Sequence, residues 1–248
     1  MLSELEIAGN AMQHRMIQLE VVTNNLANAN TVGYKRDDLF VHELDQKIKE
    51  LAYPHGGSTK VPNPGELIDF SQGALVGTGR PFDVALSGNG LFTVETPTGK
   101  AYTRDGRFQV DPEGILTTMD GFAVLGEGGP IELDLLQFTD KDLVINDMGE
   151  VILGNNVVDK LQIVTVADPR NLVKAGSNLF RPANPLTQPV AMEVPGVRHK
   201  FVEQSNVDPV TEMVAMMEIF HFFQTSQKML QAQDSTLNKA VNDVGRVI

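Results

Sequence analysis

Apolar residues near the end of the chain recur at alternating spacings of three and four, the period of a coiled-coil helix. Asp208 can cap such a helix, and Pro209 suits its first turn, where a missing N–H costs nothing. The pattern therefore predicts one long helix over residues 206–248. Its stripe comprises Met216, Ile219, Phe223, Ser226, Leu230, Gln233, Leu237, Ala240, Val244 and Val247, widened near its start by Met213, Met217 and Phe220.

A second stripe of the same period lies at the start of the chain. It comprises Leu5, Ala8, Met12, Arg15, Leu19, Val22, Leu26 and Ala29. Because the two seams match, we expect the terminal helices to pair as a coiled-coil shaft. Roughly 15 side chains gain about 1.5–3 kcal/mol each on burial, whereas ordering about 70 residues costs about 1–2 kcal/mol each. We therefore expect copies or relatives to complete the pairing, and a coiled coil that only closes a monomer remains the alternative.

The middle of the chain carries the turn chemistry. All 13 prolines lie between Pro54 and Pro209, and 19 of the 22 glycines lie between Gly56 and Gly196. From Phe82 onward, short β-type runs alternate with turn signals every eight to ten residues, which predicts antiparallel hairpins. The fold class is therefore α+β, with the helical shaft and a central sandwich- or barrel-like antiparallel β domain.

These patterns divide the chain into four segments. We expect an N-terminal helix with an Asn-rich turn, a partly helical linker, a central β domain and a C-terminal helix. Their ranges are 1–36, 37–80, 81–203 and 204–248. Within the linker, apolar spacing over 39–51 allows a helix, and short extended pieces are expected at 67–70 and 74–76.

Charge and composition exclude several classes of partner. The formal net charge of −12 argues against nucleic acid, which needs clustered Lys and Arg. No run reaches the roughly 18 apolar residues of a membrane helix, so we expect no membrane insertion. The start carries Glu4 and Glu6 and no basic region, unlike a secretory signal. The absence of cysteine excludes disulfides and thiolate chemistry.

No residue pattern points to catalysis, a cofactor or a metal. The five histidines lack metal-ligand spacing. The Gly126–Gly129 run has Ile131 where a dinucleotide fingerprint needs its third glycine. Asp105 and Asp111 precede Gly and Pro, which favours a role in turns. We expect neither an enzyme nor a small-molecule substrate, and a glycan hydrolase would need a carboxylate pair that the sequence does not indicate.

Asparagines crowd the end of the first predicted helix. Four of them fall within the seven residues from Asn24 to Asn30, and their side chains compete for backbone hydrogen bonds inside a helix. Gly33 can adopt the positive φ of a turn after a helix. The residues alone predict an elaborate helix end here.

The run from Asn24 to Arg36 resembles the N-terminal signature of the bacterial flagellar basal-body rod and hook protein family. The run 203–208 resembles the C-terminal signature of the same family, and the runs 83–92 and 102–106 resemble its central domain. Leu91 stands where a phenylalanine is common. The runs 80–86 and 126–131 most resemble the proximal-rod branch.

The resemblance implies a structural subunit of the proximal rod, the axial shaft that crosses the periplasm and transmits motor torque. It also implies partners, namely copies of the chain, other axial proteins and the flagellar type III export apparatus, with export that needs no cleaved signal peptide. A distal-rod or hook-type protein and a soluble coiled-coil adaptor are the alternatives. The predicted subunit-interface residues are Leu5, Met12, Leu19, Val22, Asn24, Asn25, Leu26, Asn28, Gly33, Met213, Met217, Phe220, Phe223, Leu230, Leu237 and Val244.

Overall fold

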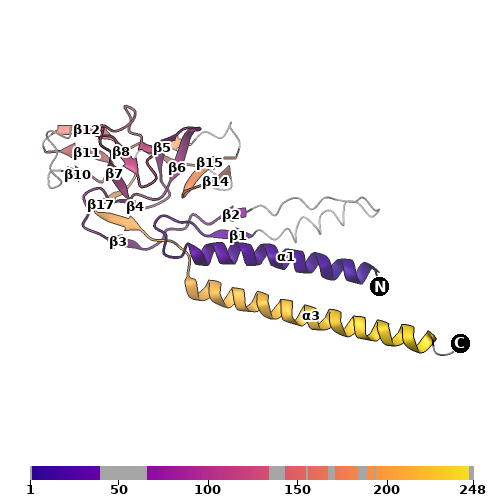
Figure 1. Cartoon of the computed structure of the whole chain (residues 1–248). Coiled ribbons are helices and arrows are strands. Elements are labelled where there is room, and N and C mark those ends of the chain that lie inside the picture. The colour runs from indigo at the N-terminus through magenta and orange to yellow at the C-terminus, as the bar shows by residue number, and fades with distance from the viewer. Residues whose placement is uncertain are drawn as a thin grey trace. The chain divides into compact units, whose positions relative to one another are not determined.

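The computed structural model describes residues 2–39, 66–133, 143–154, 156–166, 171–183, 189–192 and 194–245 (Figure 1). The chain forms two compact units. The helical unit comprises Met1–Ala27 and Asp208–Ile248, and the β unit comprises Asn28–Val207. Helices and many antiparallel strands confirm the α+β class.

The helical unit contains α1 (Leu2–Ala27) and α3 (Pro209–Gly245). Asp208 caps α3, as predicted. Its carboxylate accepts hydrogen bonds from the N–H of Val210 at 3.2 Å and from Oγ1 of Thr211 at 2.5 Å. The Thr211 hydrogen bond holds the pKa of Asp208 below its usual range. A capped start of this kind satisfies N–H groups that have no partner inside the helix.

The two helices contact each other and run antiparallel (Figure 1). The Arg15 guanidinium lies over the Phe222 ring, 5.0 Å from its centroid. On α3, Ile219 is buried and Phe223 is half-buried, whereas Met217 is exposed. The stripe predicted from the sequence therefore has a packed side and an exposed side. That the two helices form a coiled-coil shaft stays a prediction.

Within the described residues, the largest sheet of the β unit has nine strands, ordered β14-β15-β6-β5-β9-β8-β7, with β13 pairing both β5 and β16. All of its pairings are antiparallel. The strands are β5 (Leu91–Thr96), β6 (Gly99–Thr103), β7 (Phe108–Val110), β8 (Leu116–Thr118), β9 (Ala123–Val124), β13 (Ile163–Thr165), β14 (Leu172–Gly176), β15 (Leu179–Pro182) and β16 (Val190–Ala191). This confirms the predicted hairpins, while their closure into a sandwich or barrel stays a prediction.

The described residues of the β unit also form smaller sheets. One three-stranded sheet is ordered β10-β11-β12, and three two-stranded ribbons pair β1 with β2, β3 with β18 and β4 with β17. Their bounds are β1 (Asp37–Leu39), β2 (Glu66–Ile68), β3 (Leu75–Gly77), β4 (Val84–Leu86), β10 (Leu143–Ile145), β11 (Glu150–Leu153), β12 (Asn156–Lys160), β17 (Val197–His199) and β18 (Phe201–Glu203). The ribbons formed by β17 and β18 join the end of the β unit to strands near its start.

Among the described residues of the β unit, buried apolar side chains form a large core and a smaller second cluster. Phe92 and Phe108 are fully buried and meet edge to face, with ring centroids 5.2 Å apart. Val84, Val94 and Val197 are equally inaccessible. This core includes residues from β4, β5, β7 and β17, so it depends on strands that lie far apart in the sequence.

Part of the segment 37–80, predicted to be a partly helical linker, lies among the described residues. The helix allowed over 39–51 lies outside the described residues, apart from Leu39, which ends β1. The two extended pieces expected near 67–70 and 74–76 correspond to β2 and β3. By their contacts the described residues of this segment belong to the β unit. Its role as a linker stays a prediction.

Candidate functional site

Three distant segments meet inside the β unit at a cluster of buried charges. The Nζ atom of Lys35 lies 2.6 Å from Oε1 of Glu203, and Nε of Arg104 lies 2.5 Å from Oε2 of the same residue. Lys35, Arg104 and Glu203 are 1%, 3% and 1% exposed. These three residues are called the ion cluster below. Each comes from one of the runs that carry the sequence resemblance.

The remaining polar groups of the ion cluster bind backbone. Lys35 donates to the carbonyl of Ser71 at 2.6 Å, and Glu203 accepts the N–H of Gly73 at 2.9 Å. Arg104 donates to the carbonyl of Leu86 at 2.9 Å and also to that of Gly90. Buried charges are tolerated when they are paired and hydrogen-bonded. The cluster meets that condition and binds four backbone groups, from residues 71–73 and 86–90.

Burial lowers the pKa of Lys35 from its ordinary value, and the hydrogen bond to Glu203 opposes that shift. The nearby charge of Arg104 lowers the pKa further, whereas that of Asp69 raises it. Two cations therefore compete for one fully buried carboxylate. The negative charge of Glu203 offsets the free-energy cost of burying these two cations.

Gly33 lies against the ion cluster, and its backbone has φ +70°, the positive value predicted from the sequence. Its N–H donates to the carbonyl of Glu203 at 2.7 Å. A Cβ at this position would lie 2.5 Å from the backbone N of Asp105. The position therefore requires glycine both for its backbone conformation and for the close approach of residues 104–105.

Asn206, near the end of the β unit, forms hydrogen bonds to residues near the start of this unit. Its Oδ1 accepts the N–H of Arg36 at 2.8 Å. Its Nδ2 donates to the carbonyl of Asp69 at 2.8 Å and to Oγ of Ser71 at 3.0 Å. The asparagine of the C-terminal signature thus crosslinks residues on both sides of the ion cluster.

Lys174 contacts the segment 34–37, which carries Lys35 of the ion cluster. Its Nζ lies 2.7 Å from Oδ2 of Asp37, 2.9 Å from the carbonyl of Lys35 and 3.9 Å from the Tyr34 ring centroid. Sequence reasoning missed Lys174, which stands in no recognisable motif. It also missed the roles of Lys35, Arg104 and Glu203, although each stands in a quoted motif, because a motif does not show which of its residues meet.

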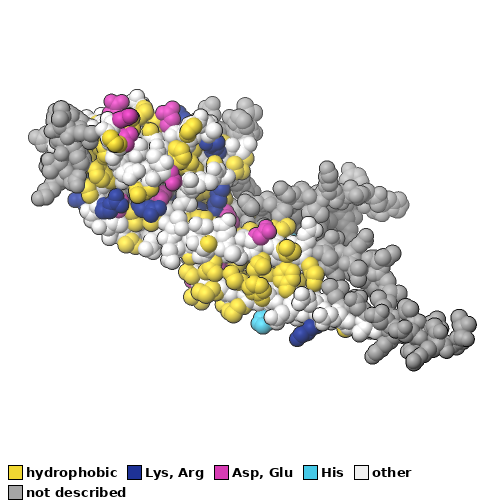
Figure 2. Space-filling view, viewed as in Figure 1, with side chains coloured by type: hydrophobic (Ala, Val, Ile, Leu, Met, Phe, Trp, Pro, Cys, Tyr) yellow, Lys and Arg dark blue, Asp and Glu magenta, His cyan; other side chains and the backbone are white. Residues whose placement is uncertain are grey.

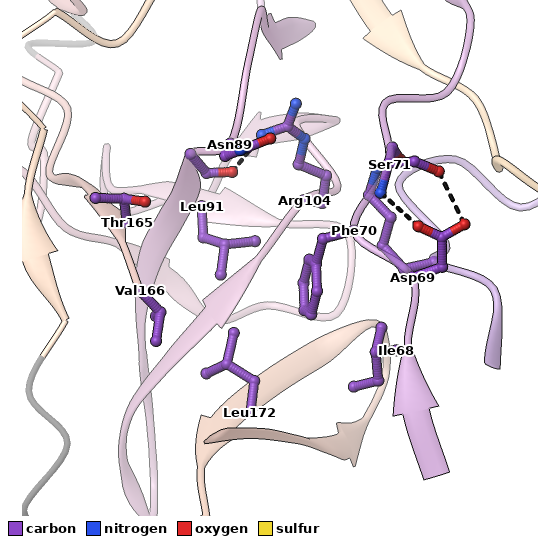
Figure 3. A pocket seen from close by; sticks show the side chains of 12 residues that line it. Ile68, Asp69, Phe70, Ser71, Asn89, Leu91, Arg104, Thr165, Val166 and Leu172 are labelled. Atoms are coloured by element: carbon purple, nitrogen blue, oxygen red, sulfur yellow. Dashed lines mark hydrogen bonds between the residues drawn. The ribbon is translucent and has the colours of Figure 1, made fainter. Parts of the chain in front are cut away.

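A cavity of about 430 Å³ opens beside the ion cluster (Figure 3). Phe70, Leu91 and Leu172 give it apolar walls, and Asp69 and Arg104 stand at its polar side. The Asp69 carboxylate already accepts the N–H and Oγ of Ser71. Across the described ranges, no three His, Asp or Glu residues are grouped as a metal ion requires.

The predicted interface residues fall into three groups. Met213, Met217 and Phe220 are exposed on α3, and Met12, Leu19, Val22, Leu26 and Phe223 are half-buried. Near the end of α1, Asn24 is exposed and Asn25 is buried, and Asn28 accepts a hydrogen bond from Thr31 at 3.2 Å. The side chains of Leu5, Leu230, Leu237 and Val244 lie outside those described. As a subunit interface, the set stays a prediction.

Figure 2 shows hydrophobic side chains gathered over the described part of the helical unit. They include Val210, Met213, Met217 and Phe220, which are 65%, 46%, 54% and 48% exposed. Among the described helices, none combines the length and the apolar character needed to cross a membrane. The described residues thus combine two helices, one of which exposes apolar side chains, with an antiparallel β unit that contains a paired and hydrogen-bonded ion cluster.

Three family models match the chain in order. They are described as flagella basal body rod protein (residues 5–35), flagellar hook protein FlgE/F/G D1 domain (85–153) and flagellar basal body rod FlgEFG protein C-terminal (198–243). Each matched region supplies one residue of the ion cluster.

Curated relatives match over nearly their whole length. The flagellar basal-body rod protein FlgF of Caulobacter vibrioides is 34% identical over 93% of both chains. FlgG of Bacillus subtilis is 31% identical over 98% of this chain and 99% of its own, and FlgF of Mesorhizobium japonicum is 28% identical over 99% of both. The chain belongs to the flagellar basal-body rod protein family, which confirms the resemblance found in its sequence.

Proposed function

We propose that the chain is a structural subunit of the flagellar basal-body rod, of the proximal-rod kind. Its relatives are named as rod proteins, and the fold supplies two long helices for assembly. Successive subunits associate head to tail through these helices, and such heterologous contacts propagate a helical shaft instead of closing a ring. The β units form its outer layer, and the shaft transmits torque for motility.

The exposed apolar row on α3 carries this proposal. Val210, Met213, Met217 and Phe220 follow spacings of three, four and three, so they line one face of the helix. Ile219 lies about half a turn away from this row and is buried. A helix with a second apolar face in water is suited to another helix, because such patches mark association surfaces. This row therefore favours association between subunits over closure of a monomer.

The partners follow from the same proposal. They are copies of this chain, neighbouring axial proteins and, during assembly, the flagellar type III export apparatus, with the basal body as the location. The runs 80–86 and 126–131 and the 34% identity to FlgF of Caulobacter support the proximal rod, whereas FlgF of Mesorhizobium at 28% and FlgG of Bacillus at 31% do not separate the two kinds. A distal-rod or hook-type protein is the nearest alternative, and a coiled-coil adaptor is the alternative outside the family's role.

The test uses Met217→Asp and Phe220→Asp in the full chain. Each places a carboxylate in the proposed seam, where an unpaired buried charge costs several kcal/mol. Thr225→Asp is the control, because Thr225 is exposed on α3 away from the row and the change introduces the same carboxylate outside the proposed seam. Each variant replaces the native chain in its own bacterium, and swimming and basal-body images are recorded.

We expect the two seam variants to abolish rods and swimming, while the control swims normally. Normal rods in both seam variants would overturn the assignment of the row. Electron microscopy of concentrated purified protein separates a rod subunit from an adaptor, since an adaptor stops at a defined oligomer. A density tag on the chain, located in basal-body images, separates the proximal from the distal rod.

A further inference from the structure

We propose that the ion cluster is a folding latch, through which the arrival of Glu203 makes the whole β unit stable. Lys35 and Arg104 enter the fold early in the sequence, and Glu203 joins them from its last strand, β18. The latch is a conformational device of the β unit. It goes beyond the assembly role and does not depend on which rod segment the chain builds.

The first argument is electrostatic. Within the described part of the chain, Lys35 and Arg104 each form their ion pair with Glu203. A fold that lacked this carboxylate would hold two cations, only 1% and 3% exposed, without their ion-pair partner. Removing one partner of a buried ion pair is strongly destabilising, because the remaining charge is neither hydrated nor paired.

The second argument is the reach of the contacts in sequence. The Lys35–Glu203 and Arg104–Glu203 contacts span 168 and 99 residues. The same short segment also supplies the carbonyl that receives the Gly33 N–H and the β18 pairing with β3. When a chain emerges with its N-terminus first, both cations are present long before their carboxylate. Stable folding then waits for the end of the β unit.

The third argument is the closeness of the packing. A Cβ on Gly73 would lie 2.0 Å from the carbonyl oxygen of Gln204, so these two stretches of backbone touch directly. Gly33 is in similarly direct contact with residues 104–105. These contacts fix the backbone on one side of the cluster, whereas the cavity lined by Lys35 and Arg104 borders its other side. The close backbone contacts therefore tie the position of Glu203 to the segments that carry Lys35 and Arg104.

A buried ion pair need not add stability in total, because a well-packed apolar group often performs as well. The latch instead requires an asymmetry: losing Glu203 alone must be far worse than losing all three charges together. It also requires that the effect reach strands far from the cluster, because a latch controls the whole unit. Both requirements can be measured in the full-length protein.

The experiment compares Glu203→Gln with the triple variant Lys35→Met, Arg104→Met and Glu203→Gln. The substitution Glu127→Gln is the control, since Glu127 pairs with Lys160 at an exposed site. Urea unfolding gives the folding equilibrium constant, and hydrogen exchange reports protection strand by strand.

We expect Glu203→Gln to lower the folding equilibrium constant at least about 100-fold and Glu127→Gln to change it less than about 5-fold. The triple variant should recover at least about 10-fold relative to Glu203→Gln. Protection should fall across β5, β8 and β9 in Glu203→Gln, because those strands unfold with the rest.

Two results would overturn the latch. One is a loss of protection confined to 33–36, 71–73 and 201–206, which would make the cluster a local support. The other is a triple variant no more stable than Glu203→Gln. If Glu203→Gln does not fold at all, the triple variant decides alone: folding supports the latch, and failure to fold refutes it.

Discussion

Replacing Gly33 by alanine should destabilise the β unit far more than the same change at Gly79. The two glycines share nearly the same backbone conformation, with φ +70° and +75°. For an alanine this left-handed conformation costs about 1–2 kcal/mol. Alanine also reduces the entropy of the unfolded chain by about 0.4–1 kcal/mol. Because both effects are common to the two variants, they cancel when the variants are compared.

What differs is the space around each Cβ. Nothing lies within 4 Å of a Cβ built on Gly79, whereas one on Gly33 meets Asp105 N at 2.5 Å, Asp105 Cα at 2.6 Å and Arg104 C at 2.8 Å. These are backbone atoms, which cannot rotate out of the way. The segment around Gly33 must therefore move and lose the hydrogen bond to Glu203, which adds about 1–3 kcal/mol for the buried groups left unpaired.

Urea unfolding of the two purified variants, followed by circular dichroism, measures this difference. We expect Gly33→Ala to lose at least about 2 kcal/mol more than Gly79→Ala, which combines the lost hydrogen bond with the strain of displaced backbone. Equal losses in the two variants would refute the close approach of Gly33 to residues 104–105. A residue bulkier than alanine at Gly33 should likewise weaken the β unit itself as well as the helix end.

Two further predictions concern the β unit. Phe92→Ala should lower the free energy of unfolding by about 3–5 kcal/mol through the cavity it leaves in the core. Val157→Ala, at a side chain 59% exposed, should change it by less than about 0.5 kcal/mol. Similar melting temperatures of the two variants would contradict this prediction. Burial lowers the pKa of His199, whose Nε2 lies 2.8 Å from the Pro81 carbonyl oxygen. The unfolded chain thus binds a proton at His199 more readily than the folded chain does. The contribution of His199 to the free energy of unfolding is therefore fully present above pH 6.5 and is lost as the pH falls below 6.5. His199→Gln should flatten the fall in melting temperature between pH 7 and 5, and an unchanged slope would argue against this linkage.

Local features could be read from the sequence because local chemistry decides them. The Asp208 cap, the positive φ of Gly33 and the turn role of Asp111 are all present, and Asp111 accepts the N–H groups of Glu113 and Ile115. Each depends on residues within a few positions of one another. The α+β class followed from the contrast between the three-four spacing of apolar residues at the two ends of the chain and the short β-type runs in its middle.

Long-range pairing could not be read in the same way. Alternating apolar runs predict strands but do not say that β13 pairs with β5 or that β17 pairs with β4. The ion cluster is harder still to predict from the sequence, because it includes Lys35 and lysine is almost always exposed. Nothing in residues 69–73 of the sequence indicates that the backbone of Ser71 and Gly73 binds the cluster. Only the assembled backbone shows that these groups meet.

The crosslink between the two ends of the β unit has a consequence for the helices. The hydrogen bonds from Gly33 to Glu203 and from Arg36 to Asn206 hold the two exits of this unit together. Closing a flexible loop as long as residues 28–207 would cost about 4–5 kcal/mol by the (3/2)RT ln n relation. Once the β unit is folded, its hydrogen bonds already hold its two exits together, so pairing of α1 with α3 needs no further closure of that long loop. The meeting of the two helices then becomes as local an event as the closing of a helical hairpin.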